Sequence, residues 1–290
     1  MPYLALPRRR FLRTALLGGA ASAISLPAAD SATARWALFS DTHVPGDPNM
    51  IARGFRPHEN ARRAVQEALK ISPDGAAICG DLARTSGLLE DYQALRQILQ
   101  PLSRVAPVAM AMGNHDDRDT FLKVFADHPG ESAGVAKKHV LILQTAGVRF
   151  ILLDSLLFVN KTPGLLGVAQ RTWLQKYLQN GGNSPVLLFL HHTLADNDSA
   201  LLDAGRFLDL IQPFRQVKAV FYGHSHRLSF DQSGGIHLVN LPATGYNFGD
   251  PQPVGWMEAK VSRQGAGLTL HAVAGHTADD GKTTFLRWRS

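Results

Sequence analysis

The sequence predicts an α/β fold, with two sheets and several helices in one large domain. Short aliphatic or β-branched runs alternate with helical patterns from Arg35 to about residue 227, and short strands separated by Gly, Pro and Asn turns follow. The 290 residues include 45% hydrophobic ones, which suffices to bury one full core. Because neither a repeat nor a linker is evident in the sequence, we expect a single domain over residues 35–290.

Strands and helices alternate in the first half of this domain. The segment "RWALFSD" (35–41) is typical of a strand, and "PHENARRAVQEALK" (57–70) of a helix that starts at a proline. The strands "GAAICGD" (75–81) and "VAPVAMAMGNHD" (105–116) come next. A helix between them is predicted by the helical spacing of Leu88, Tyr92, Leu95 and Leu99.

The second half is predicted to contain a hairpin, two buried strands and two helices. Trp173 and Leu178 mark one helix, and the other lies near residues 199–212; we expect no helix after Arg227. The strands, in chain order, are "HVLILQT", "VRFILLDS", "PVLLFLHH" and "VKAVFYGHSH".

Composition excludes some kinds of site. Cys79 is the single cysteine, which rules out an internal disulfide framework and a thiolate zinc cage, so a metal would need His, Asp, Glu or Asn ligands. The formal net charge is +6, but four arginines fall within the first thirteen residues and no long basic stripe follows. Nucleic-acid binding is therefore not expected.

The N-terminus predicts an export signal over residues 1–34. Arginines precede an apolar run from Ala15 to Leu26, and "ATA" at 32–34 supplies a small-residue cleavage pattern. The order "RRRFLR" resembles the twin-arginine signal, which implies the twin-arginine export machinery as a partner and a periplasmic or extracellular destination. The run is too short to span a bilayer comfortably, so we expect no membrane span in the mature protein. An amphipathic or disordered tail is the alternative.

Polar side chains follow five of the predicted strands at the points where they end. Open α/β sheets place their sites at this edge. Gly-Asp and Gly-Asn are ordinary turn dipeptides, and histidines are often surface residues, but five such motifs in order favour one shared metal site. The residues are Asp41 and His43 in "SDTH", Asp81 in "CGD", Asn114, His115 and Asp116 in "GNHDD", His191 and His192 in "LHH", and His224 and His226 in "GHSH".

This order of motifs resembles the calcineurin-like metallophosphoesterases, whose pattern is D-x-H, G-D, G-N-H-[DE], H and G-H-x-H, over residues 35 to about 245. The resemblance implies a four-layer α/β/β/α sandwich of two mixed sheets flanked by helices, with a dinuclear metal centre at the C-terminal strand ends. Mixed nitrogen and oxygen ligands suit manganese, iron, zinc or cobalt alike. By the same resemblance one metal is held by Asp41, His43, Asp81 and His226, and the second by Asp81, Asn114, His191 and His224.

The fourth motif offers two adjacent histidines. The segment "LHHTL" has Thr193 where the family more often has proline. Alignment favours His191 as the ligand and places His192 behind it, although either ring is able to reach a metal where the strand ends.

The resemblance also implies the reaction, which is hydrolysis of a small-molecule phosphoester. A hydroxide that bridges the metals attacks phosphorus in line, and His115 protonates the departing alkoxide. Asp116 is expected to orient His115 and to help it keep the proton. A histidine that is merely hydrogen-bonded at a strand end is the alternative for His115.

Two details of the motifs narrow the choice within the family: the first disfavours the purple acid phosphatases, and the second favours a phosphodiesterase. Arg84 stands where purple acid phosphatases carry a tyrosine ligand. The segments "GDLA" and "GNHD" look more like the class III cyclic-nucleotide and glycerophosphodiester phosphodiesterases than like protein phosphatases. A phosphomonoesterase or broad-specificity phosphatase of the same fold is the alternative, and a non-catalytic binding scaffold is a more distant one.

Four loops are expected to rim the pocket, over residues 44–56, 155–167, 193–199 and 244–250. None of these loops contains a motif that identifies the substrate. Three of their residues are candidate substrate contacts, with a solvated loop residue as the alternative for each: Arg53, Arg56 and Tyr246.

Changing Arg8 and Arg9 to lysine is expected to retain the protein in the cytoplasm, because the paired arginines are what the twin-arginine machinery recognises. Fractionation of cells that express the variant measures this. Arg13→Lys, which restores the residue usual at that position, is the matched control and should leave export intact. Export of the double variant at the original level would exclude the twin-arginine route.

Overall fold

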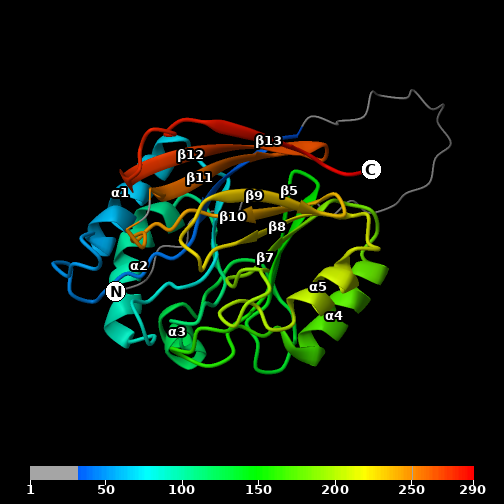
Figure 1. Ribbon diagram of the computed structural model, residues 1–290, viewed down its shortest axis with the longest axis horizontal. Helices are drawn as coiled ribbons and strands as arrows, with labels where there is room; N and C mark the ends of the chain where they lie inside the picture. Colours follow the sequence, from blue (N-terminus) through cyan, green and yellow to red (C-terminus); the bar gives the residue numbers. More distant parts are fainter. Residues whose placement is uncertain (1–31, 250) are drawn as a thin grey trace, which may run out of the picture. The chain divides into compact units, whose positions relative to one another are not determined.

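The computed structural model describes residues 32–249 and 251–290, and the predicted signal segment lies almost wholly outside them. Two mixed sheets pack face to face, and helices cover the outer side of each (Figure 1). The predicted α/β/β/α sandwich is thereby confirmed for the described residues. Of the helices among them, none is both long and apolar enough to cross a bilayer.

The first sheet has six strands in the order β13-β12-β11-β1-β2-β3. Its parallel part comprises β1 (Ala34–Phe39), β2 (Gly75–Ile78) and β3 (Val108–Met110), with Trp36 opposite Gly75. The C-terminal strands pair antiparallel and join β1 through β11; they are β11 (Pro253–Val261), β12 (Gly265–Gly275) and β13 (Thr283–Arg287).

The second sheet has seven strands in the order β4-β5-β6-β7-β8-β10-β9. The hairpin between β5 and β6 turns at Ala146 and Gly147, whose φ angles of 46° and 72° suit the twist of a two-residue hairpin loop. Strands β6, β7, β8 and β10 run parallel, and antiparallel strands lie at both edges. The bounds are β4 (Glu131–Ser132), β5 (Leu141–Thr145), β6 (Val148–Leu152), β7 (Val186–Phe189), β8 (Val217–Tyr222), β9 (Ser229–Ser233) and β10 (Ile236–Asn240).

The helices agree with the sequence patterns, except that one helix is additional and another, α5, is shorter than predicted. Helix α1 (Pro57–Lys70) has the predicted bounds, whereas α3 (Arg118–Val124) was not predicted. The carboxylate of Asp117 caps α3 by accepting a hydrogen bond from the Thr120 amide at 2.8 Å, and an aspartate at this position is a sequence signal for the start of a helix. The remaining helices are α2 (Leu89–Ser103), α4 (Gly167–Asn180) and α5 (Ala204–Ile211).

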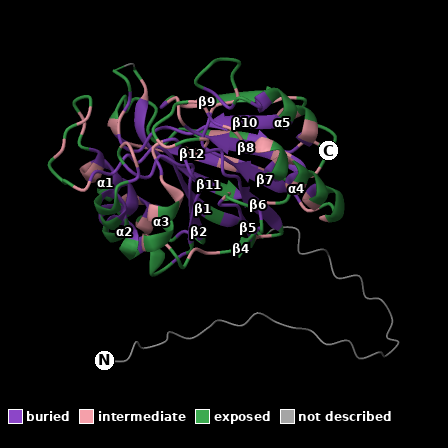
Figure 2. Cartoon of the chain, turned by 90° about the horizontal axis from the view of Figure 1, so that it is seen from below, coloured by how far each residue is buried: buried purple, intermediate pink, exposed green. Residues whose placement is uncertain are grey.

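Three apolar layers hold the sandwich together. The central layer lies between the sheets and includes the buried rings of Trp36, Phe150, Phe189 and Phe221. A second layer lies under α1 and α2, and a third under α4 and α5. Figure 2 shows the result, since the central strands are mostly buried while the helices expose their outer faces. Strands covered on both faces are apolar on both faces, which explains the unbroken aliphatic runs in the sequence.

Candidate metal centre

Five loops meet at one edge of the two sheets, and each follows one of the strands β1, β2, β3, β7 and β8. A backbone hydrogen bond from Asp41 N to Gly80 O (3.1 Å) ties the loops after β1 and β2, and one from Gly223 N to His191 O (2.9 Å) ties those after β8 and β7. The two sheets are joined where His191 Nδ1 donates to the Cys79 carbonyl at 2.7 Å. The five sequence motifs therefore converge in space as predicted.

Several of the converging residues have a strained backbone. Left-handed conformations are rare for residues with a Cβ, cost on the order of 1–3 kcal/mol each, and cluster at functional sites. The strain lets a loop reverse sharply after its strand while successive side chains point toward one centre. The five residues concerned, with φ from 43° to 72°, are Asp41, His43, Asp81, His224 and His226.

On one side of the centre, two imidazoles face each other. His43 Nε2 lies 3.1 Å from His226 Nε2. His43 Nδ1 is bonded to the Arg84 carbonyl (3.1 Å) and His226 Nδ1 to the Tyr246 carbonyl (2.6 Å). A carbonyl only accepts, so each Nδ1 carries the proton and each neutral ring presents an Nε2 lone pair to the other. Because two facing lone pairs repel each other, a positive charge between the rings would stabilise this arrangement.

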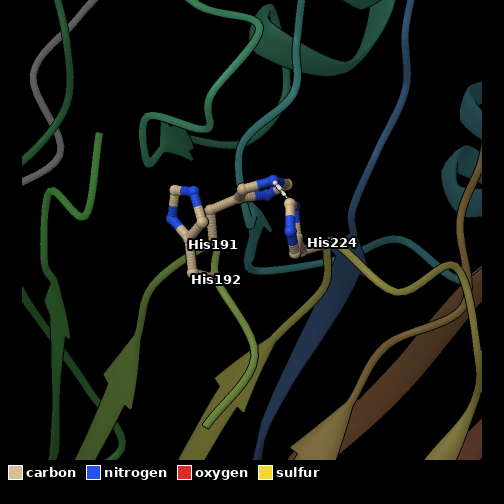
Figure 3. A group of neighbouring side chains, drawn as sticks. All are labelled: His191, His192 and His224. Atoms are coloured by element: carbon tan, nitrogen blue, oxygen red, sulfur yellow. Dashed lines mark hydrogen bonds between the residues drawn. The ribbon is translucent and has the colours of Figure 1, made fainter. Parts of the chain in front are cut away.

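The other side repeats this pattern with different atoms. His191 Nε2 lies 3.1 Å from His224 Nδ1 and 3.2 Å from Asn114 Oδ1 (Figure 3). The remaining nitrogens of the rings donate to carbonyls, His191 Nδ1 to Cys79 and His224 Nε2 to Ser199 (2.8 Å). Two lone pairs and an amide oxygen therefore converge on a second position that suits a cation. We call the position between His43 and His226 the first metal point, and the position between His191, His224 and Asn114 the second metal point.

Asp81 lies between the two points. Its Oδ2 is 3.5 Å from His43 Nε2 on one side and 3.3 Å from His191 Nε2 on the other. Asp41 adds a second carboxylate on the first side, with Oδ1 3.4 Å from His226 Nε2. The donor set therefore fits two cations, each with oxygen and imidazole ligands, that share one carboxylate.

The pKa values of these groups show how strongly the site demands positive charge. Burial lowers the pKa of His43 and of His224 to about 4, so both rings stay neutral ligands near neutral pH. Burial also opposes charge on His191 and Asp81, but their mutual attraction prevails. It raises the pKa of His191 to about 9 and holds that of Asp81 well below its usual range, so a proton and a metal cation would compete for the lone pair of His191 Nε2.

Two glycines let the loops approach this closely. A Cβ on Gly113 would lie 2.2 Å from Asp81 Oδ1, and one on Gly223 would lie 2.2 Å from Asp41 Oδ2. Neither distance is tolerable for a carbon atom. The glycines in "GNHD" and "GHSH" therefore provide space for the two carboxylates.

His192 differs from His191 in its surroundings. Its Nδ1 is 2.8 Å from the hydroxyl of Ser155, and its ring lies beside the other two imidazoles, with its centroid 4.9 Å from that of His191 and 4.8 Å from that of His224 (Figure 3). The same hydroxyl accepts from the His191 amide at 3.2 Å. Ser155, at the end of "VRFILLDS", was not singled out in the sequence because a lone serine carries no distinctive pattern.

His115 faces the pocket, but its orienting partner is not the predicted one. Its Nδ1 donates to the Thr85 carbonyl at 2.6 Å, which leaves Nε2 on the side of Asp81 Oδ2, 4.0 Å away. The prediction for Asp116 is wrong, because that carboxylate is fully buried and binds backbone amides of Leu82, Ala83 and Gly113 and the Tyr92 hydroxyl. Asp116 therefore fixes the "GDLA" and "GNHD" loops against each other.

A pocket of about 690 Å³ opens above the centre. All four predicted loops contribute to its lining, as expected, and Arg53 and Tyr246 are among the lining residues whereas Arg56 is not. Sequence reasoning missed Phe248, whose ring stacks on His226 with the centroids 4.3 Å apart. An aromatic residue in a Gly/Asn-rich loop was the available signal.

Comparison with known proteins identifies the class. The family model of calcineurin-like phosphoesterases matches residues 34–228, which is more than half of the chain. The chain therefore belongs to the calcineurin-like phosphoesterase family and is a metal-dependent phosphoester hydrolase of the kind that uses two metal ions.

Curated relatives resemble the chain over most of its length. One is a probable cyclic nucleotide phosphodiesterase of Synechococcus, 29% identical over 82% of this chain and 92% of its own. Another is the glycerophosphodiester phosphodiesterase GpdQ of Enterobacter lignolyticus, 28% identical over 72% of this chain and 76% of its own. The 3',5'-cyclic adenosine monophosphate phosphodiesterase CpdA of Pseudomonas aeruginosa is 25% identical over 72% and 75%.

Solved structures share the fold. A dimetal phosphatase from Danio rerio superimposes with a TM-score of 0.71 over 89% of this chain and all of its own, at 14% identity. A purple acid phosphatase from yellow lupin gives 0.64 over 89% of this chain and 54% of its own, at 15% identity. At such low identity the likeness concerns the sandwich itself.

Separate alanine substitutions at His191 and His192 are expected to differ in bound metal. His191→Ala removes a lone pair directed at the second point and should lower the metal content from two ions per chain to about one. His192→Ala removes a ring that packs behind it and should keep both ions, with at most a modest loss of affinity. Elemental analysis of the purified variants measures the difference, and the reverse pattern would make His192 the ligand.

Proposed function

We propose that the protein is a phosphodiesterase whose centre holds two divalent or trivalent ions. The proposal rests on one observation: a pair of imidazoles directs its lone pairs inward on each side of Asp81 Oδ2. The proposed ligands are Asp41, His43, Asp81 and His226 for one ion, and Asp81, Asn114, His191 and His224 for the other. Manganese, iron, zinc and cobalt all remain suitable.

The bound ions supply one part of the chemistry: they lower the pKa of a shared water and offset the negative charge of the phosphoryl oxygens. The rest belongs to the chain. His115 donates from Nδ1 to the Thr85 carbonyl, so the ring has a second proton to give, at Nε2, only as the imidazolium; in that form it delivers the Nε2 proton to the departing alkoxide. The Thr85 carbonyl orients the ring, in the role first expected of Asp116.

Two observations support a diester as substrate. Relatives that resemble the chain over most of its length carry names of cyclic-nucleotide or glycerophosphodiester phosphodiesterases. The pocket is also lined beside both halves of the centre, by Tyr246, which packs on His43 and His226, and by Ser199, whose carbonyl accepts from His224. A diester places one alcohol substituent on each side of phosphorus, whereas a monoester would fill only one of these spaces.

The site of action is part of the proposal. The "RRRFLR" sequence and the apolar run after it support export by the twin-arginine route to the periplasm or beyond. That route carries folded proteins, so the ions would be acquired before export.

Asp81→Ala should abolish hydrolysis of bis(4-nitrophenyl) phosphate and lower the metal content, because it removes the one oxygen close to both points. A spectrophotometric assay and elemental analysis of the same preparation measure the two effects. Asp209→Ala, which removes an exposed carboxylate from α5, is the control and should behave like the parent protein. Two bound ions with near-normal turnover in Asp81→Ala would refute the bridging role.

His115→Ala should keep both ions and lose on the order of a hundredfold or more in kcat on a dialkyl phosphodiester, whose alkoxide needs a proton to depart. On bis(4-nitrophenyl) phosphate the loss should be much smaller, since nitrophenolate leaves without protonation. His276→Ala, at an exposed position, is the control. An equal loss on both substrates would assign His115 to substrate positioning, and a lost ion would make it a ligand.

A further inference from the structure

Three residues form one wall of the pocket beside the first metal point: Arg53, Tyr246 and Phe248. We call them the Arg53 wall. Tyr246 packs against both His43 and His226, with ring centroids 4.8 Å apart in each case. The wall is therefore attached directly to two of the proposed ligands, although none of its side chains is needed to hold a metal.

Phe248 separates Arg53 from the metal centre. The ring of Phe248 stacks on the His226 imidazole at 4.3 Å and 24° between planes. The guanidinium carbon of Arg53 lies 4.6 Å from the centroid of the same phenyl ring. Since the imidazole covers one face, the guanidinium lies over the other, and the two groups are held one ring thickness apart.

Arg53 is held in place without satisfying its charge. Its backbone is left-handed (φ 50°), in a tight turn closed by mutual amide-to-carbonyl hydrogen bonds between Ala52 and Phe55, both 2.9 Å. Among the described residues its guanidinium has no carboxylate or carbonyl partner, only the face of Phe248. A strained backbone that presents an unpaired cation to a substrate pocket indicates a ligand for that cation.

We propose that Arg53 binds a second anionic group, a carboxylate or a phosphate, on one substituent of the diester; this inference rests on the proposed function. A guanidinium forms paired hydrogen bonds with either anion. The scissile phosphoryl group is not its partner, because Phe248 keeps Arg53 one ring away from His226. Metal ions bound at the centre would also repel the guanidinium, so an anionic group between Arg53 and the ions would be attracted to both.

The test compares two competitive inhibitors that differ in one group. Glycerol 3-phosphate and 3-phosphoglycerate share a phosphate and a three-carbon chain, and the second has a carboxylate where the first has a hydroxymethyl group. Inhibition constants are measured against bis(4-nitrophenyl) phosphate. The parent protein should bind 3-phosphoglycerate about ten- to a hundredfold more tightly, as expected for a charge-assisted hydrogen-bonded pair.

Arg53→Ala should remove this preference by weakening 3-phosphoglycerate alone, with the metal content unchanged. Arg53→Lys should retain part of it, since the charge remains without the paired donors. Arg56→Ala is the matched control, because Arg56 is an exposed arginine of the same loop outside the pocket lining. It should keep the full preference.

The outcomes separate the two proposals. If the metal-loaded parent protein does not hydrolyse bis(4-nitrophenyl) phosphate, the proposed function is contradicted. Normal turnover without a preference for 3-phosphoglycerate overturns the role of Arg53 only. An equal weakening of both inhibitors in Arg53→Ala also overturns it, since the arginine would then act on the shared phosphate.

Discussion

Backbone carbonyls that fix the tautomers of four histidines are the constraint on which the centre depends. Each carbonyl accepts a hydrogen bond from one ring nitrogen, which keeps its proton, and the other nitrogen is left as a lone pair directed inward. The four carbonyls come from three loops, those after β2, β7 and β10, so the direction of every lone pair depends on how those loops pack. The sandwich supplies that packing, because the strands before the loops are locked into two sheets with a shared apolar layer.

The cost of this arrangement is visible in the backbone and in the charges. Left-handed residues recur in the loops that carry the ligands, and buried carboxylates face buried imidazoles. These costs are offset by cations, which satisfy lone pairs and carboxylates together. Arg53 extends the same logic to the pocket wall, where strain again accompanies a side chain that lacks a partner within the described residues.

Much of the fold was accessible from the sequence because its elements are patterned locally. Helix α1 begins at a proline and repeats its apolar face at helical spacing, so its bounds could be predicted. Helix α3 is short and its apolar face is a single buried residue, Phe121, so it gave no periodic signal. Helix α5 is shorter than predicted, because the residues before Ala204 belong to the loop after β7.

The sequence by itself determined the order of the ligand motifs, and hence the family, because those residues stand at fixed offsets from strand ends. It did not determine what each side chain touches. The partner of His115 is a carbonyl of Thr85, and Asp116, its neighbour in sequence, binds three amides instead. Such contacts were decided by the tertiary structure alone, because they join residues from separate loops whose positions follow from the packing of the two sheets.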